Sequence, residues 1–193
     1  MNKHSLYPLN INGDYSNFVQ EIIEKLWQIP RSGWKDREVK NPETVGEHTD
    51  EVVALAEKHF HIPLLTTMLR VHDWAESDKK VGDIRTDPFC PPEKRWTKKE
   101  KYKVELEAMT TLCSNLGPYG PMYFYLWLEF EERKTPRAQK AFQIDKFQPI
   151  IRAIEYQKEG QPVIAQEFID YDGPKITDNF LRKKMDQAIA ELR

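Results

Sequence analysis

Residues 63–76, which read PLLTTMLRVHDWAE, carry the pattern that decides the fold. Pro63 suits the first turn of a helix, because its fixed φ matches helical backbone. Its lack of an amide hydrogen costs nothing there, because first-turn amides have no acceptor within the helix. Positions then recur at intervals of three and four residues, the period of a helix with one buried face: Leu65, Met68, Leu69, His72, Asp73 and Glu76. We therefore expect one helix whose broad apolar face ends in ionisable side chains.

The same period extends outward from this stretch. Thr44 and Glu47 form a capping-box pattern at the start of a preceding helix, which carries His48 on its apolar face. Further helices are predicted over 15–27, 98–115, 121–133, 136–157 and 177–192. Residues 80–97 and 159–176 are expected to be loops, with a short strand possible at 163–165. No alternation of strands and helices suggests a parallel sheet, so the predicted fold class is all-α.

Length and composition limit the class of protein. The chain has 193 residues, which fits one domain over 1–193. With a formal net charge of −2, it lacks the basic excess expected of a protein that binds duplex nucleic acid or a membrane surface. No apolar run is long enough for a membrane span, and residues 1–16 lack the apolar stretch of a secretion signal. Cys90 and Cys113 are expected to be reduced thiols of a cytoplasmic protein.

Ionisable residues interrupt the apolar faces in three places. His48 points toward the core with its apolar neighbours, although a lone core histidine is ordinarily structural. His72 and Asp73 follow Met and Leu residues on their helix, and carboxylates are costly to bury there unless they are paired or coordinated. Asp145 lies in an apolar helix and also needs a cation, for which Lys146 or an arginine such as Arg152 would be the ordinary partner.

Together these residues supply two imidazole nitrogens and two carboxylates. Such a mixed set suits Mn, Fe, Co, Ni or Zn better than an all-oxygen cage suits Mg or Ca. Four protein ligands leave open positions on an octahedral ion for water and a phosphoryl oxygen. Glu76 is close enough in sequence to His72 to contact that water without being a ligand. Spacing alone does not establish this assembly, because the ligands lie far apart in the chain.

The order His…His-Asp…Asp resembles the signature of the HD superfamily of metal-dependent phosphohydrolases. The resemblance is closer to the HD-domain 5′-deoxynucleotidase family, and it covers about residues 31–157. Its motifs are Arg31-Ser32-Gly33-Trp34, the run Asn41 to His48, His72-Asp73-Trp74-Ala75-Glu76, Gly82-Asp83-Ile84, Glu107-Ala108-Met109, Leu126 to Glu131, Asp145-Lys146 and Glu155-Tyr156.

The resemblance implies an HD-domain helical bundle that removes the 5′-phosphate from deoxyribonucleoside 5′-monophosphates. It implies that a divalent metal cation is held by His48, His72, Asp73 and Asp145. The candidate cations are then Mn, Co, Fe, Ni, Zn or Mg. The family is commonly homodimeric, and the helix over 177–192 is a candidate either to cap the core or to form the dimer face.

The resemblance also implies roles near the substrate. Glu76 matches the acid that positions or deprotonates the attacking water, and Arg31 matches a basic residue near the phosphate. Trp34 matches a tryptophan that packs on the sugar and disfavours a 2′-hydroxyl, and Asp83 matches an acid that accepts a hydrogen bond from the 3′-hydroxyl. Without the family pattern, Trp34 would be a packing residue and Arg31 a surface charge at a helix end.

Two segments depart from the family pattern. Residues 77–81 insert five residues where the family has three, and the insertion carries Lys79 and Lys80. These lysines are candidate contacts for additional phosphates, which makes a deoxynucleoside triphosphate triphosphohydrolase an alternative. The loop over 85–97 is longer than the family pattern and is either a lid or a space-filling segment.

The same residues bear on two further classes of protein. A non-catalytic nucleotide-binding HD protein would have lost a ligand or Glu76, and none is missing here. Oxygenase chemistry at two irons would need further histidine ligands, and His59 and His61 lie away from the apolar face. No residue pattern indicates a preferred base.

Overall fold

The computed structural model describes residues 14–192 of the chain. In this range the backbone consists of helices and connecting loops, with a single isolated bridge between Pro30 and Thr44 and no strand. The all-α prediction is therefore confirmed. The expectation that the first residues contain no secretion signal falls largely on residues 1–13, which lie outside the described part.

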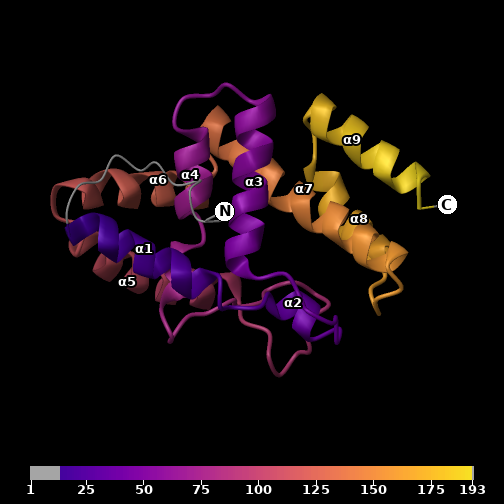
Figure 1. Ribbon diagram of the computed structural model, residues 1–193, viewed down its shortest axis with the longest axis horizontal. Coiled ribbons are helices and arrows are strands. Elements are labelled where there is room, and N and C mark those ends of the chain that lie inside the picture. Colours follow the sequence, from indigo (N-terminus) through magenta and orange to yellow (C-terminus); the bar gives the residue numbers. More distant parts are fainter. Residues whose placement is uncertain (1–13, 193) are drawn as a thin grey trace.

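Nine α-helices and three short 3₁₀-helices follow one another over the described residues (Figure 1). The α-helices are α1 (Asp14–Leu26), α2 (Ser32–Lys35), α3 (Val45–His59), α4 (Leu65–Val71), α5 (Lys98–Ser114), α6 (Gly120–Glu132), α7 (Pro136–Lys158), α8 (Ala165–Asp172) and α9 (Asn179–Ala190). The 3₁₀-helices are η1 (Trp74–Ser77), η2 (Gly117–Tyr119) and η3 (Gly173–Lys175).

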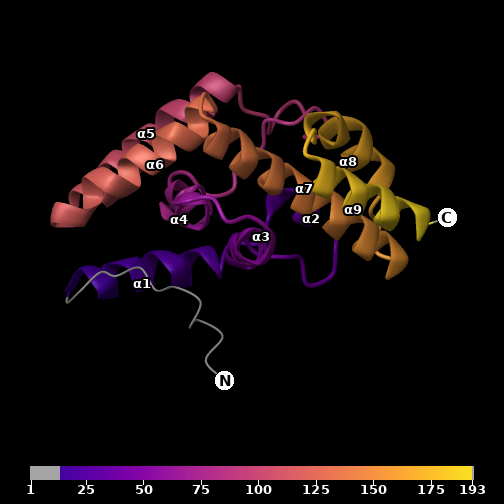
Figure 2. The same ribbon diagram turned by 90° about the horizontal axis from the view of Figure 1, so that it is seen from above.

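The central element is α4, the helix of the opening motif. Figure 2 shows it between α1 on one side and the α5–α6 pair on the other. It packs directly on α3, α6 and α7, and its side chains Met68, Leu69 and Val71 are completely buried. The residues that follow α4 therefore lie in the interior of the bundle.

The start of α3 forms as its sequence predicts. Thr44 accepts a hydrogen bond from the Glu47 amide while the Glu47 carboxylate accepts one from the Thr44 amide, which completes the capping box. Gly46 in the first turn lies against Trp27, just after α1. A Cβ atom there would lie 2.4 Å from Trp27 Cδ1, so the close approach of α1 and α3 requires glycine.

The single helix predicted over 63–76 is wrong at both ends. Leu64 has a left-handed backbone with φ 61°, so α4 begins at Leu65 rather than at Pro63. The helix ends at Val71, and Glu76 lies on η1. The imidazole Nδ1 of His72 lies 2.7 Å from the Leu69 carbonyl oxygen, in place of an amide from the next turn. This side-chain bond therefore uses a carbonyl of the last helical turn at the point where α4 ends.

The predicted loop over 159–176 is also wrong, because it contains α8 and η3, and no strand forms at 163–165. The N-cap residue Ile164 has no side-chain capping bond. Instead, the Ala165 amide donates to Gln157 Oε1 at 2.7 Å, a side chain of α7. The short helix α2 was likewise not predicted. The loop over 80–97 is confirmed, and Cys90 and Cys113 are both free and buried.

At the far end of the bundle, α9 runs beside α7. Gln143 Oε1 accepts hydrogen bonds from the amides of Thr177 and Asp178 just before α9, and Lys158 pairs with Glu191 just after it. The residues 177–192 thus contact α7 at Gln143 and at Lys158. Within residues 14–192 no helix has the length and apolar character needed to cross a membrane.

Candidate active site

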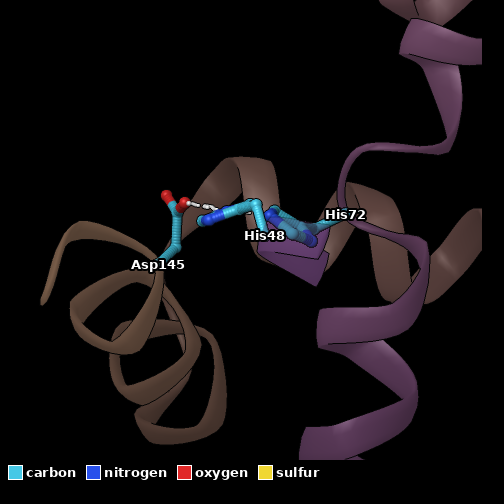
Figure 3. A group of neighbouring side chains, drawn as sticks. All are labelled: His48, His72 and Asp145. Atoms are coloured by element: carbon cyan, nitrogen blue, oxygen red, sulfur yellow. Dashed lines mark hydrogen bonds and ion pairs between the residues drawn. The ribbon is translucent and has the colours of Figure 1, made fainter. Parts of the chain in front are cut away.

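Three buried side chains from different helices converge at the centre of the bundle (Figure 3). His48 projects from α3, His72 follows α4 and Asp145 projects from α7. One ligand atom from each lies within 4.8 Å of the other two. His48 Nε2 is 3.2 Å and His72 Nε2 is 3.7 Å from Asp145 Oδ1. Nitrogen and oxygen atoms at these separations can share one cation.

Asp73 completes the predicted set from the edge of the cluster. Its Oδ2 lies 3.1 Å from His72 Nε2 and 3.9 Å from His48 Nε2. His72 Nε2 is buried and yet forms no hydrogen bond, although that carboxylate is near. A ring nitrogen that is buried without a hydrogen bond, next to two carboxylates and a second imidazole, is a suitable ligand for a metal ion. The four predicted ligands therefore come together in the structure.

The electrostatic environment of the cluster favours positive charge. Burial alone would lower the pKa of His72, but the carboxylates of Asp73 and Asp145 outweigh it and raise the pKa to about 10. Burial likewise opposes ionisation of Asp145, yet Lys146 and the two histidines hold its pKa well below the usual value. A proton or a metal ion at this point is therefore strongly stabilised by the carboxylates.

Each imidazole is oriented through its other ring nitrogen. His48 Nδ1 lies 2.8 Å from Gln148 Oε1, and His72 Nδ1 lies 2.7 Å from the Leu69 carbonyl oxygen. Both Nδ1 atoms are therefore donors, so in the neutral imidazoles both Nε2 lone pairs are available to coordinate a metal. Gln148 was not predicted from the sequence. Its only local signal is a polar residue three positions after Asp145 on the apolar face of α7.

A cavity of about 320 Å³ opens beside the cluster. His72, Asp73 and Asp145 line it, and so do four further residues predicted for the site: Arg31, Trp34, Glu76 and Asp83. Lys79 and Lys80 are exposed and do not line this cavity, so the structure does not bring them to the other site residues. The cavity is also lined by cations that were not predicted from the sequence, among them Lys98, Lys101, Arg133 and Lys175.

Glu76 is almost fully buried at the cavity wall, 3% exposed. Burial, with the nearby charges of Asp73 and Asp83, raises its pKa well above the usual value, and Lys101 acts in the opposite direction. Lys101 Nζ lies 3.4 Å from Glu76 Oε1 and 3.3 Å from Glu105 Oε1. The pKa of Glu105 rises to about 7 for the same main reason, burial. Glu76 is therefore a stronger base than an exposed glutamate.

Arg31 presents an unsatisfied donor. Its Nη1 is buried and has no hydrogen-bond partner. Although burial lowers the pKa of a guanidinium, the charges of Asp83 and Glu43 raise that of Arg31. A guanidinium that lines the cavity and has a donor without a partner is suited to an anionic oxygen, for example of a phosphate.

Trp34 and Asp83 are held in place by neighbours on α2 and beyond. The Trp34 indole donates to Glu43 Oε2 at 3.0 Å and stacks on Phe168 with 4.8 Å between ring centroids. Asp83 accepts a hydrogen bond from the Ser32 amide, and its carbonyl accepts one from the Ser32 hydroxyl at 2.7 Å. The longer segment 77–81 therefore leaves Asp83 at the cavity, beside α2.

Comparison with known proteins identifies relatives over most of the chain. A family model described as HD domain matches residues 23–181. The 5′-deoxynucleotidase HDDC2 of Dictyostelium discoideum is 33% identical over 159 residues, which cover 75% of this chain and 80% of that protein. The 5′-deoxynucleotidase HDDC2 of Bos taurus is 30% identical over 177 residues, with 89% and 80% covered.

Solved structures share the fold. A protein from Pyrococcus horikoshii superposes with a TM-score of 0.67 at 22% identity, covering 91% of this chain and 98% of that one. A predicted metal-dependent phosphohydrolase from Magnetospirillum magnetotacticum gives a TM-score of 0.65 at 24% identity, with 92% of both chains covered. At these identities the likeness concerns the fold alone.

Proposed function

The chain belongs to the HD domain family, and from this premise we propose that it is an enzyme that removes the 5′-phosphate from deoxyribonucleoside 5′-monophosphates. The relatives named 5′-deoxynucleotidase support the reaction, and they match most of the chain. One structural observation carries the proposal: His48, His72 and Asp145 converge within 4.8 Å beside a cavity that also contains Glu76 and the free donor of Arg31.

In this proposal His48, His72, Asp73 and Asp145 hold a divalent cation. The ion supplies Lewis acidity to the phosphoryl group and lowers the pKa of water. The mixed nitrogen and oxygen donors favour Mn, Co, Fe, Ni or Zn, and Mg is included in the tests.

The chain's own residues perform the remaining tasks. Arg31 donates to a phosphate oxygen and offsets its charge, because its buried Nη1 has no other partner. Glu76 accepts a proton from the attacking water, for which its raised pKa suits it. Trp34 and Asp83 contact the sugar, with Asp83 accepting from the 3′-hydroxyl. The water oxygen bonds to phosphorus as the P–O5′ bond breaks, and the 5′-oxygen leaves as the nucleoside hydroxyl with a proton that balances the one Glu76 accepts from the water.

The test is phosphate release from a panel of deoxyribonucleoside and ribonucleoside monophosphates with Mn²⁺, Co²⁺ or Mg²⁺. Phosphate release from the deoxyribonucleotides is expected, with loss of at least about 100-fold for Glu76→Gln. Glu132→Gln is the matched control, because Glu132 is an exposed glutamate outside the cavity. Release no greater than a metal-only blank, with every metal, would overturn the proposal.

The same panel of substrates distinguishes this reaction from the competing ones. Triphosphate, rather than orthophosphate, as the product from a deoxynucleoside triphosphate would indicate the triphosphohydrolase. That reaction was suggested by Lys79 and Lys80, which lie outside the cavity. A non-catalytic nucleotide-binding protein would bind deoxynucleotides and release nothing. Two-iron oxygenase chemistry would need His59 as an additional ligand, but the ring of His59 packs on Phe180 instead.

Three further parts of the proposal concern the whole chain. A single HD domain over residues 1–193, a homodimer and a cytoplasmic location are all proposed from the resemblance and the composition. Light scattering on the purified protein tests the dimer. A measured mass of 22.8 kDa, that of a single chain, would contradict it. Limited proteolysis tests the single domain.

A further inference from the structure

Two aromatic side chains contact each other edge to face in the lining of the cavity. Phe89 comes from the loop 85–97 and Tyr171 from α8, and both line the cavity. Their ring centroids are 5.9 Å apart, and the rings are nearly perpendicular at 85°. Phe89 is 41% exposed, in a cavity lined largely by charged residues. An exposed aromatic ring at such a position is a surface on which a planar ligand can stack.

The loop that presents Phe89 is held by ion pairs centred on the buried Arg85. Arg85 donates to Asp87 through Nε at 2.9 Å and Nη2 at 2.7 Å, and its Nη1 donates to Asp36 Oδ2 at 2.8 Å. Asp87 in turn accepts a hydrogen bond from the Phe89 amide at 3.0 Å. This network ties the loop to Asp36, the residue that follows α2. Phe89 is therefore positioned before a ligand arrives, which reduces the entropy lost on binding.

Aromatic and cationic groups connect this pair to Trp34. Phe168 of α8 stacks on Trp34 at 4.8 Å, and the guanidinium carbon of Arg37 lies 4.9 Å from the Phe168 centroid and 5.9 Å from that of Phe89. All four of these residues line the cavity. A ligand that extends from Trp34 toward the solvent therefore meets an aromatic surface.

We propose that Phe89 and Tyr171 form the nucleobase subsite of the cavity. This inference rests on the proposed function, which places the phosphate at the metal ligands and the sugar at Trp34. The base then extends toward the exposed Phe89 ring, which stacks on its face. Tyr171 lies nearly perpendicular to Phe89, has Lys175 Nζ 3.5 Å from its ring centroid, and packs edge-on beside the base. A ring recognises the face of a base rather than its hydrogen-bonding edge, so all four bases bind and the larger purines bind more tightly.

The experiment compares dAMP with 2-deoxyribose 5-phosphate, which has the same phosphoester and sugar but no base. Values of kcat and KM are measured for the wild type, Phe89→Ala, Tyr171→Ala and Tyr171→Phe. For the two alanine variants we expect KM for dAMP to rise about tenfold or more with kcat little changed. Their KM for the base-free compound stays at the wild-type value, and Tyr171→Phe behaves as the wild type because it keeps the ring.

Trp96→Ala is the matched control. Trp96 lies on the same loop with a similar exposure, 40%, but it is not among the residues that line the cavity. The KM for dAMP is therefore expected to stay unchanged. Thermal melts of each variant monitor folding, and Phe89→Leu provides a second, conservative removal of the ring.

Two results would overturn the subsite. One is an unchanged KM for dAMP in both alanine variants, and the other is an equal rise in KM for dAMP and for the base-free compound. Failure of the proposed function gives a different result, namely no hydrolysis of either compound by the wild type. In that case calorimetric titration with dAMP in the presence of Mn²⁺ tests the subsite directly, and equal affinity of the wild type and Phe89→Ala would reject it.

Discussion

Nδ1 of His48 lies 2.8 Å from Oε1 of Gln148, and both side chains are buried. The amide of Gln148 has no freedom to rotate, because its Nε2 donates to the carboxylates of Glu43 and Glu51. Its oxygen must therefore face His48, and the imidazole must be protonated at Nδ1. Since Glu43 also accepts from Trp34, one chain of hydrogen bonds joins the cavity wall to a proposed metal ligand.

Replacing Gln148 by alanine should weaken metal binding. Without the amide, the ring of His48 loses its orientation and its preferred tautomer, and the affinity for Mn²⁺ is expected to fall about 10- to 100-fold. Calorimetric titration of the chelator-treated protein measures the effect. Gln143→Ala is the control, because Gln143 lies on the same helix but bonds to the residues before α9. Equal affinity of Gln148→Ala and the wild type would show that the hydrogen bond does not orient the ligand.

Metal removal should lower the stability of the folded protein. A metal that binds only the native state stabilises it by about 2.7 kcal/mol at a concentration of 100 times Kd. The melting temperature of the chelator-treated wild type is therefore expected to rise on addition of Mn²⁺, and that of Asp145→Asn to stay constant. Asp170→Asn, at an exposed position on α8, should respond as the wild type does. An undiminished rise with Asp145→Asn would exclude that residue as a ligand.

Replacing Lys101 by methionine should shift the pH dependence of hydrolysis. Burial and the charges of Asp73 and Asp83 raise the pKa of Glu76, and Lys101 is the group that lowers it. Loss of Lys101 therefore raises this pKa further. Because Glu76 must be ionised to accept a proton, the acidic limb of kcat/KM moves to higher pH, and activity falls more at pH 6 than at pH 9.

The matched control for that profile is Lys103→Met, an exposed lysine on the same helix. Its acidic limb should coincide with that of the wild type. A Lys101→Met profile that is lower at every pH by the same factor would contradict the electrostatic explanation and indicate a role in packing or substrate binding instead.

Replacing Gly46 by alanine should destabilise the contact between α1 and α3. The new Cβ would lie 2.4 Å from Trp27 Cδ1 and 2.9 Å from the Trp27 Cα, so the backbone itself must move. Overpacking of this kind lowers the free energy of unfolding by about 1–3 kcal/mol, as urea denaturation would measure. Gly33→Ala is the control, because nothing lies within 4 Å of its added Cβ. Equal stability of both variants would refute the steric argument.

Much of the architecture could be predicted from local sequence. The helical period and the capping box of Thr44 and Glu47 predicted most helices to within one or two residues, because these signals act between near neighbours. The failures have tertiary causes. The amide at the start of α8 is capped by Gln157 of another helix, and α4 ends where the His72 side chain takes the Leu69 carbonyl.

The sequence by itself predicted several chemical groups of the candidate site: two imidazoles, their neighbouring carboxylates and a flanking arginine and glutamate. Only the tertiary structure decided which of them meet. His48 and Gln148 are 100 residues apart, and Lys79 and Lys80 fall outside the cavity that the distant Lys101 enters. The physical reason is that residue type and spacing determine local backbone and chemistry, whereas burial, pKa and coordination depend on what other helices bring within a few ångströms.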